Sequence, residues 1–154
     1  MCVSIFFCTF VSLYNYIMTN LNDCRIIDLR KISDPTRGNL TVVEQQEHIN
    51  FEIKRAYWIY DVPSGESRGG HAHKTLYQLL VPMSGSFKVM LDNGRERKEV
   101  LLNHPWQGLL LVPGIWRTLE DFSSGAVCMC LASEHYDEEE YIRDYDEFKA
   151  IYGK

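Results

Sequence analysis

Short apolar segments separated by turn signals dominate the chain from residue 40 onward. They read LTVVE, FEIKRAYWIYDV, LYQLLVPM, SFKVML, RKEVLL, GLLLVP and AVCMCLAS. A spacing of roughly 8 to 12 residues between such segments is typical of sandwiches and barrels, and it differs from the alternation of βαβ units. Asn93-Gly94 lies between two of the segments and favours a hairpin turn. The sequence therefore predicts an all-β sandwich or barrel.

The last twenty residues, HYDEEEYIRDYDEFKAIYGK, follow a different pattern. Tyr141, Tyr145 and Phe148 recur at helical spacing, behind Asp137 as a possible cap with Glu140 three residues later. This pattern predicts a C-terminal amphipathic helix whose acidic residues form its solvated face.

Residues 1–17 are apolar and uncharged, so a signal peptide or a membrane anchor has to be considered. The segment has no basic region and no clear cleavage site, and polar residues interrupt a run barely long enough to span a bilayer. Because Met18 begins an ordinary-looking start, we expect residues 1–17 to be a non-native or disordered extension from an over-extended start codon. An anchor or an extra strand remains open. We expect residues 18–154 to form a single domain.

The net charge of the chain limits its possible binding partners, and its cysteines indicate a cellular compartment. A net charge of −5 argues against nucleic-acid binding, although a few converging arginines could still bind a small anion. The five cysteines are odd in number and lack metal-type spacing, which favours reduced thiols and a cytoplasmic protein without membrane contact. Cys128 and Cys130 are expected to be small buried hydrophobes.

Two motifs resemble those of the cupins. The first runs from Gly65 through His71, His73 and Gln78 to Gly85, with Gln78 where the family usually has glutamate. The second is GLLLVPGIWRT, in which Arg117 replaces the usual histidine. The resemblance implies a double-stranded β-helix, the jelly-roll barrel of the cupins. His71 and His73 would share one strand face, which the resemblance places toward the lumen.

The two replacements argue against a metal site. A cupin centre of the family type uses three imidazoles and one carboxylate, whereas this motif offers two imidazoles, an amide and a guanidinium that neither deprotonates nor ligates. We therefore expect no metal and no cofactor.

A closer resemblance covers Arg25 to Tyr152. The blocks DPTRGNLTVVE, FEIKRAYWIYDVP, RGGHAHK, VPGIW and DFSSGAVCMCLASEHYDEEEYIRDYDEF resemble the dTDP-4-oxo-6-deoxy-sugar 3,4-ketoisomerases. The resemblance implies a metal-free homodimer, with N-terminal strand exchange, that converts a dTDP-linked 4-oxo-6-deoxyhexose to its 3-oxo isomer. The product would supply an aminotransferase that makes 3-amino sugars for surface glycans such as lipopolysaccharide.

Moving the ketone from C4 to C3 requires removal of the C3 proton, an enediol and reprotonation at C4. Neutral imidazole is available for this task at cytosolic pH. The resemblance assigns the base to His73, and it leaves His71 to orient the substrate or to shuttle a proton.

Cationic and polar side chains in the same blocks are expected to bind the substrate. Guanidinium groups match the geometry of phosphate and of developing oxyanions. Tyr57 alternates with Arg55 on one strand face, and it could donate to a sugar oxygen or pack in the core. Gln78 would need a bend in the chain after His73 to face the same lumen, and Trp116 could stack on the ligand or pack in the core. The arginines expected to bind the substrate are Arg68 and Arg117, which are the strongest candidates, followed by Arg55 and Arg37.

Three other classes remain open. A dTDP-sugar 3,5-epimerase shares the architecture, a metal-dependent oxygenase would need the ligands that Gln78 and Arg117 replace, and a non-catalytic nucleotide-sugar-binding cupin would bind without turnover. The sequence leaves the gluco or galacto configuration of the product and the identity of the nucleotide undecided.

Overall fold

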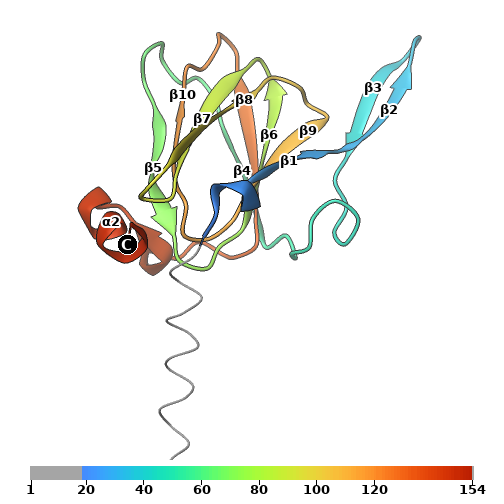
Figure 1. Cartoon of the computed structure of the whole chain (residues 1–154). Helices are drawn as coiled ribbons and strands as arrows, with labels where there is room; N and C mark the ends of the chain where they lie inside the picture. The colour runs from blue at the N-terminus through green and yellow to red at the C-terminus, as the bar shows by residue number, and fades with distance from the viewer. Residues whose placement is uncertain (1–18, 154) are drawn as a thin grey trace, which may run out of the picture.

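The computed structural model describes residues 19–153, and two five-stranded sheets face each other in it to form a barrel (Figure 1). One sheet has the order β1-β9-β6-β11-β4 and the other β12-β5-β10-β7-β8. The strands of the first sheet are β1 (Arg25–Asp28), β9 (Gln107–Leu111), β6 (Gln78–Ser84), β11 (Val127–Ala132) and β4 (Arg55–Ile59). Those of the second are β12 (Tyr141–Ile142), β5 (Arg68–His73), β10 (Trp116–Glu120), β7 (Phe87–Asp92) and β8 (Arg97–Leu102). This architecture confirms the predicted all-β cupin fold. The prediction for residues 1–17 lies outside the described residues.

Alternation along the strands builds the core between the two sheets. On β7, Phe87, Val89 and Leu91 are fully buried and alternate with partly exposed residues. Burial of each such side chain stabilises the folded state by about 1.5–3 kcal/mol. The predicted turn at Asn93-Gly94 is confirmed, because it joins β7 to β8 as an antiparallel hairpin.

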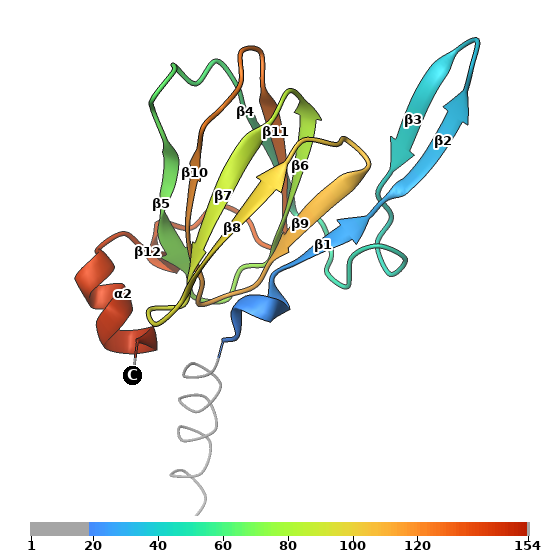
Figure 2. The same cartoon turned by 45° about the horizontal axis from the view of Figure 1, so that its top comes forward.

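A second layer of packing lies outside the first sheet. Ile49 and Phe51 cover Leu79, Val81 and Leu131 on the outer face of that sheet. Within residues 19–153, the strands β2 (Arg30–Asp34) and β3 (Gly38–Val42) pair only with each other, and they project away from the barrel as a hairpin (Figure 2).

The C-terminal helix is present but shorter than predicted. It is α2 (Tyr145–Tyr152), whose cap is Asp144, with the side chain accepting a hydrogen bond from the Glu147 amide at 2.8 Å. Asp137 caps only the 3₁₀ turn η2 (Glu138–Glu140). Tyr141 therefore belongs to β12 and not to the helix, because its segment extends the second sheet along the edge of β5. Tyr145 and Phe148 are on the helix as predicted, and they pack against Trp116.

One further short element, the 3₁₀ turn η1 (Leu21–Asp23), precedes β1. Within residues 19–153, no helix is long and apolar enough to cross a bilayer.

Candidate active site

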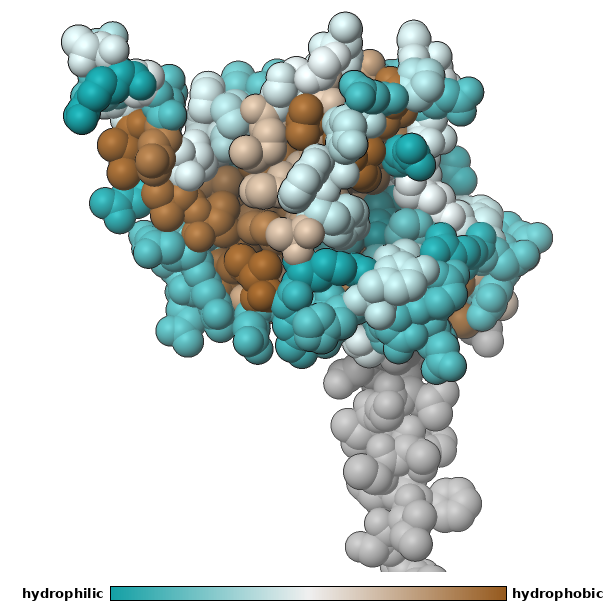
Figure 3. All heavy atoms as spheres, turned by 180° about the vertical axis from the view of Figure 1, so that it is seen from behind, coloured by the Kyte–Doolittle hydropathy of each residue, from teal (hydrophilic) through white to brown (hydrophobic). Residues whose placement is uncertain are grey.

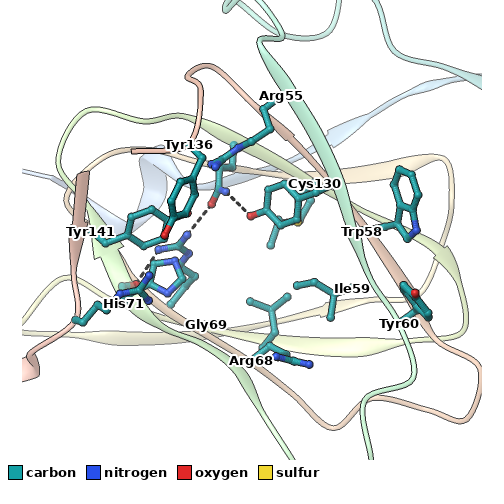
Figure 4. Close-up of a pocket in the computed structure, with 16 residues that line it drawn as sticks. Arg55, Trp58, Ile59, Tyr60, Arg68, Gly69, His71, Cys130, Tyr136 and Tyr141 are labelled. Carbon is teal, nitrogen blue, oxygen red and sulfur yellow. Dashed lines mark hydrogen bonds between the residues drawn. The ribbon is translucent and has the colours of Figure 1, made fainter. Parts of the chain in front are cut away.

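An open cavity of about 910 Å³ lies between the two sheets of the barrel (Figure 4). Strands β4, β5, β6, β10 and β11 line it, and the C-terminal segment before α2 adds the rest of the wall. Six of the eight site residues predicted from the sequence line it: Arg55, Tyr57, Arg68, His71, Gln78 and Arg117.

The two histidines lie at different depths. They are two residues apart on β5, and their ring centroids are 4.9 Å apart with the rings nearly perpendicular. His71 is on the cavity wall, whereas His73 lies deeper, is only 3% exposed and does not line the cavity. Of the two, His71 is therefore the histidine that is open to this cavity.

Burial and positive charge keep both imidazoles neutral. Desolvation, with a further effect of the Arg117 guanidinium, lowers the pKa of His71 to about 3. The same two causes, in the same order, lower the pKa of His73 well below its usual range. Both rings are thus in the proton-accepting form at physiological pH.

Arg117 joins the two sheets through a buried hydrogen-bond chain. Its guanidinium, 4% exposed, donates to the carbonyl oxygen of His71 and to the Oε1 atom of Gln78, both at 2.8 Å. Gln78 Nε2 in turn donates to the Tyr57 hydroxyl at 2.8 Å, and dashed lines in Figure 4 mark these bonds. Burial lowers the pKa of Arg117 to about 10, so this group is still cationic at neutral pH.

The structure explains how Gln78 reaches the lumen. The chain leaves the second sheet after His73 and crosses to the first sheet, where Gln78 begins β6. The passage of the chain from the second sheet to the first thus provides the change of direction that we expected between His73 and Gln78.

A glycine permits the close approach of β5 to β10. Gly69 has φ +88°, and a Cβ atom there would lie 2.8 Å from the carbonyl oxygen of Arg117. The pairing of β10 with β5 also shifts register between Arg117 and Thr118. Gly69 and this shift in register therefore lie beside Arg117, the residue that binds both His71 and Gln78.

Arg55 and Tyr57 both line the cavity from β4, as their alternation predicted. The Nε and Nη2 atoms of Arg55 are buried and have no hydrogen-bond partner within residues 19–153. The guanidinium lies 5.3 Å from the ring centroid of Tyr57 and 5.5 Å from that of Tyr136. A cation whose buried donors are unused is suited to an anionic ligand. Figure 4 shows Arg68 on another part of the wall.

Arg37 is, besides His73, the other predicted site residue that does not line this cavity. It lies in the tight turn between β2 and β3, and Nη2 of its exposed side chain pairs with Asp34 Oδ2 at 2.7 Å. Hydrogen bonds from Thr36 and Arg37 lower the pKa of Asp34 to about 2. Within its own chain, Arg37 is therefore part of the hairpin turn.

Three lining residues from the C-terminal segment were not predicted from the sequence: Tyr136, Tyr141 and Arg143. Assigning Tyr141 to the helical pattern hid its position. Asp144, three residues before Glu147, was the signal that the helix begins later. Trp116 faces the other way, because its ring packs on Tyr145 and Phe148 outside the barrel.

The cysteines behave as predicted where the structure describes them. Cys24, Cys128 and Cys130 are free and buried, with the sulfur atoms of the latter two 3.9 Å apart. Cys130 also lines the cavity beside Tyr57.

Comparisons with known proteins agree with this site. The family described as FdtA: WxcM-like, C-terminal matches residues 22–153. The chain is 46% identical over 130 residues to TDP-4-oxo-6-deoxy-alpha-D-glucose-3,4-oxoisomerase from Aneurinibacillus thermoaerophilus, covering 84% of this chain and 93% of that protein.

Two solved structures show the same relationship. A 3,4-ketoisomerase from Helicobacter canadensis is 45% identical, with a TM-score of 0.80 and coverage of 83% of this chain and 96% of that one. A mutant of the 3,4-ketoisomerase QdtA from Thermoanaerobacterium thermosaccharolyticum, in complex with TDP-4-keto-6-deoxyglucose, is 40% identical, with a TM-score of 0.82 and coverage of 85% and 94%. The chain belongs to the family of TDP-sugar 3,4-ketoisomerases, which are isomerases with a cupin fold.

Proposed function

We propose that this chain converts a dTDP-linked 4-oxo-6-deoxyhexose to its 3-oxo isomer. The observation that carries the proposal is a neutral imidazole, His71, on the wall of a cavity that also holds a buried, charged guanidinium. The relatives support the choice of substrate, because one is named for this oxoisomerisation and another is in complex with TDP-4-keto-6-deoxyglucose.

The reaction moves one proton from C3 to C4 and a second proton from the C3 oxygen to the C4 oxygen. His71 removes the proton from C3, and the C–H electron pair forms the C3–C4 double bond while the π pair of the C4 carbonyl moves onto the C4 oxygen, which takes up a proton to give an enediol. The C3 hydroxyl then loses its proton and becomes the ketone as a proton is delivered to C4. The resemblance assigned the base to His73, whereas the depths of the two rings favour His71 as the group that meets the sugar. His73, which lies behind His71, would then hold the His71 ring in place or relay a proton.

Tyr57 and Arg117 supply the electrostatic stabilisation. Burial raises the pKa of Tyr57 above its usual value, so the phenol keeps its proton. Its oxygen accepts from Gln78, and the hydroxyl lies on the cavity wall beside Cys130, where a sugar oxygen could replace Cys130 as the partner of its proton. Preorganised donors and charges of this kind stabilise an enediolate more than they stabilise the ketone.

We propose that turnover needs no metal. Arg117 Nη2 lies 2.8 Å from Gln78 Oε1, so a cationic group that cannot ligate lies at the motif position of a cupin ligand. Its positive charge opposes protonation of both histidines, and it would oppose a metal cation in the same way.

Arg55 and Arg68 are assigned to the diphosphate. Arg55 has unused buried donors, and Arg68 lines the same cavity from β5. Guanidinium forks bind phosphate oxygens in pairs, which would fix the nucleotide relative to His71.

We further propose that the protein is a cytoplasmic homodimer with exchanged N-terminal strands that serves the synthesis of surface glycans such as lipopolysaccharide. Large apolar side chains are exposed around the hairpin and on the first sheet, including Leu40 at 56%, Trp58 at 62% and Met83 at 52%. Figure 3 shows apolar side chains gathered on this side of the molecule. A surface of this kind is typical of a protein interface. A hairpin that exchanges between subunits would carry Arg37 to the cavity of the partner.

The test is incubation of the purified protein with dTDP-4-oxo-6-deoxyglucose in D₂O, followed by NMR of the product. A 3-oxo sugar with deuterium at C4 is the expected result. Deuterium at C3 and C5 with the 4-ketone retained would identify a 3,5-epimerase, and saturable binding without turnover would identify a binding module. Either result would refute the proposal.

A further inference from the structure

We infer that Tyr141 is a positioning residue that holds the imidazoles of His71 and His73 in place through its aromatic ring. This inference rests on the proposed function, since it concerns how the proton-transfer groups are oriented. The ring centroid of Tyr141 lies 4.4 Å from that of His73 at an interplanar angle of 68°, and 4.8 Å from that of His71 at 50°. One side chain thus touches both histidines.

Hydrogen bonds of the ring nitrogens do not provide this orientation. Within residues 19–153, neither nitrogen of His73 nor Nδ1 of His71 has a hydrogen-bond partner of standard geometry. In most proton-transfer sites a carboxylate or carbonyl fixes the tautomer and the angle of the histidine. The backbone groups that interact with the rings are those of Glu140 for His73 and of Gly69 for His71, and the effect of each on the pKa is smaller than that of burial. Packing is therefore the main restraint on this ring.

The backbone next to Tyr141 is held firmly against β5. Tyr141 pairs with His73 in the register between β12 and β5. The Glu140 carbonyl accepts from the Lys74 amide at 3.1 Å, and Glu140 Oε2 accepts from the Thr75 amide at 2.9 Å. The C-terminal segment is thus attached to the chain directly after the second histidine.

The Tyr141 ring is also restrained by a cation. The Arg143 guanidinium lies 4.4 Å from the ring centroid, and Arg143 is itself fixed by two hydrogen bonds to Glu138, at 2.6 and 3.0 Å. A guanidinium over the face of an aromatic ring is attracted to the ring, so it restrains the ring's position. Contacts from Arg143 and the two imidazoles therefore leave the ring little freedom, and the positions of the histidines depend on a segment that follows the barrel.

The experiment compares Tyr141→Phe, which keeps the ring, with Tyr141→Leu, which removes it. Tyr145→Leu is the matched control, because Tyr145 is an aromatic of the same C-terminal region that packs outside the barrel on Trp116 and Phe148. For each variant kcat and KM are measured, and the ring titration of both histidines is followed by NMR.

We expect the kcat of Tyr141→Phe to stay within about threefold of the wild-type value. Tyr141→Leu should lose about 10- to 100-fold in kcat with KM nearly unchanged, because small misplacements of reacting groups lower the rate by factors of this size. In Tyr141→Leu the His73 ring should titrate at a higher pH, because water reaches it, and Tyr145→Leu should change neither quantity.

Three results would overturn the inference. A loss of kcat in Tyr141→Phe equal to that in Tyr141→Leu would assign the role to the hydroxyl, and an equal loss of kcat in Tyr145→Leu would indicate general destabilisation. The third result is an unchanged kcat and an unchanged histidine titration in Tyr141→Leu. If the wild-type protein shows no turnover, the proposed function fails, and the histidine titrations alone still decide whether Tyr141 positions the rings.

Discussion

Arg117 binds the backbone of His71, with Nη1 donating to the carbonyl oxygen at 2.8 Å across 46 residues of sequence. The same guanidinium binds Gln78 on the facing sheet, so one buried cation fixes two walls of the cavity. Burial is the main cause of the lowered pKa of the neighbouring imidazoles, and the charge of Arg117 lowers it further. The residue that distinguishes this motif from a metal-binding cupin thus has a structural and an electrostatic role.

Replacement of Arg117 by lysine should affect both roles. Lysine keeps the charge but cannot make the two-pronged contact, so either the His71 carbonyl or Gln78 loses its partner. We expect a loss of about 1–3 kcal/mol in the free energy of unfolding and about 10²-fold in kcat. Chemical denaturation and steady-state kinetics measure the two effects. A variant with wild-type kcat would show that the guanidinium geometry is not required.

The two histidines can be distinguished by single substitutions with asparagine. A general base contributes about 10²- to 10⁴-fold in rate, and we expect a loss in this range for His71→Asn. His73→Asn should lose less, because that ring is set behind the cavity wall. His104→Asn, whose ring packs on Trp106, serves as the control for kcat. A greater loss in His73→Asn than in His71→Asn would return the base to His73.

Stability should fall as the pH drops below the ordinary histidine pKa of about 6.5. Both folded-state values are depressed, to about 3 for His71 and further for His73, so the unfolded chain binds more protons between pH 6.5 and pH 3. Each histidine then removes up to about 1.4 kcal/mol of stability per pH unit. Denaturation at pH 7.0, 6.0 and 5.0 measures the slope, and His73→Asn should reduce it. An equal slope in that variant would contradict the assignment of this pH dependence to His73.

Restoring the usual cupin ligands should create a metal site. The double variant Gln78→Glu with Arg117→His provides one carboxylate and three imidazoles where the wild type has an amide and a guanidinium. We expect this variant to bind Zn²⁺ in calorimetry and the wild type not to bind it in the cavity. Equal Zn²⁺ affinity of the two proteins would show that Arg117 does not exclude cations.

The sequence predicted the barrel well because its signals are local. Alternating strands, the turn at Asn93-Gly94 and the spacing of His71, His73 and Gln78 are each readable over a few residues. The relative depths of the two histidines could not be predicted, since both alternate onto the same strand face.

The C-terminal segment and Arg37 show where local reasoning fails. Tyr141 fits a helical period, but its backbone pairs with β5, and a pairing across almost seventy residues leaves no mark in the local pattern. Arg37 lies in a block that resembles the family, yet the hairpin that carries it projects away from its own barrel. In both cases the tertiary contact and not the residue type decides the position.

The most direct test of the central claim is turnover by protein stripped of metal. The purified chain is dialysed against chelator, its residual iron, zinc and nickel are quantified by mass spectrometry, and the conversion of dTDP-4-oxo-6-deoxyglucose is followed by NMR in the presence of chelator. We predict the full wild-type rate of 3-oxo product formation with far less than one metal ion per chain. Loss of turnover on stripping, with recovery on addition of one of these metals, would contradict the account.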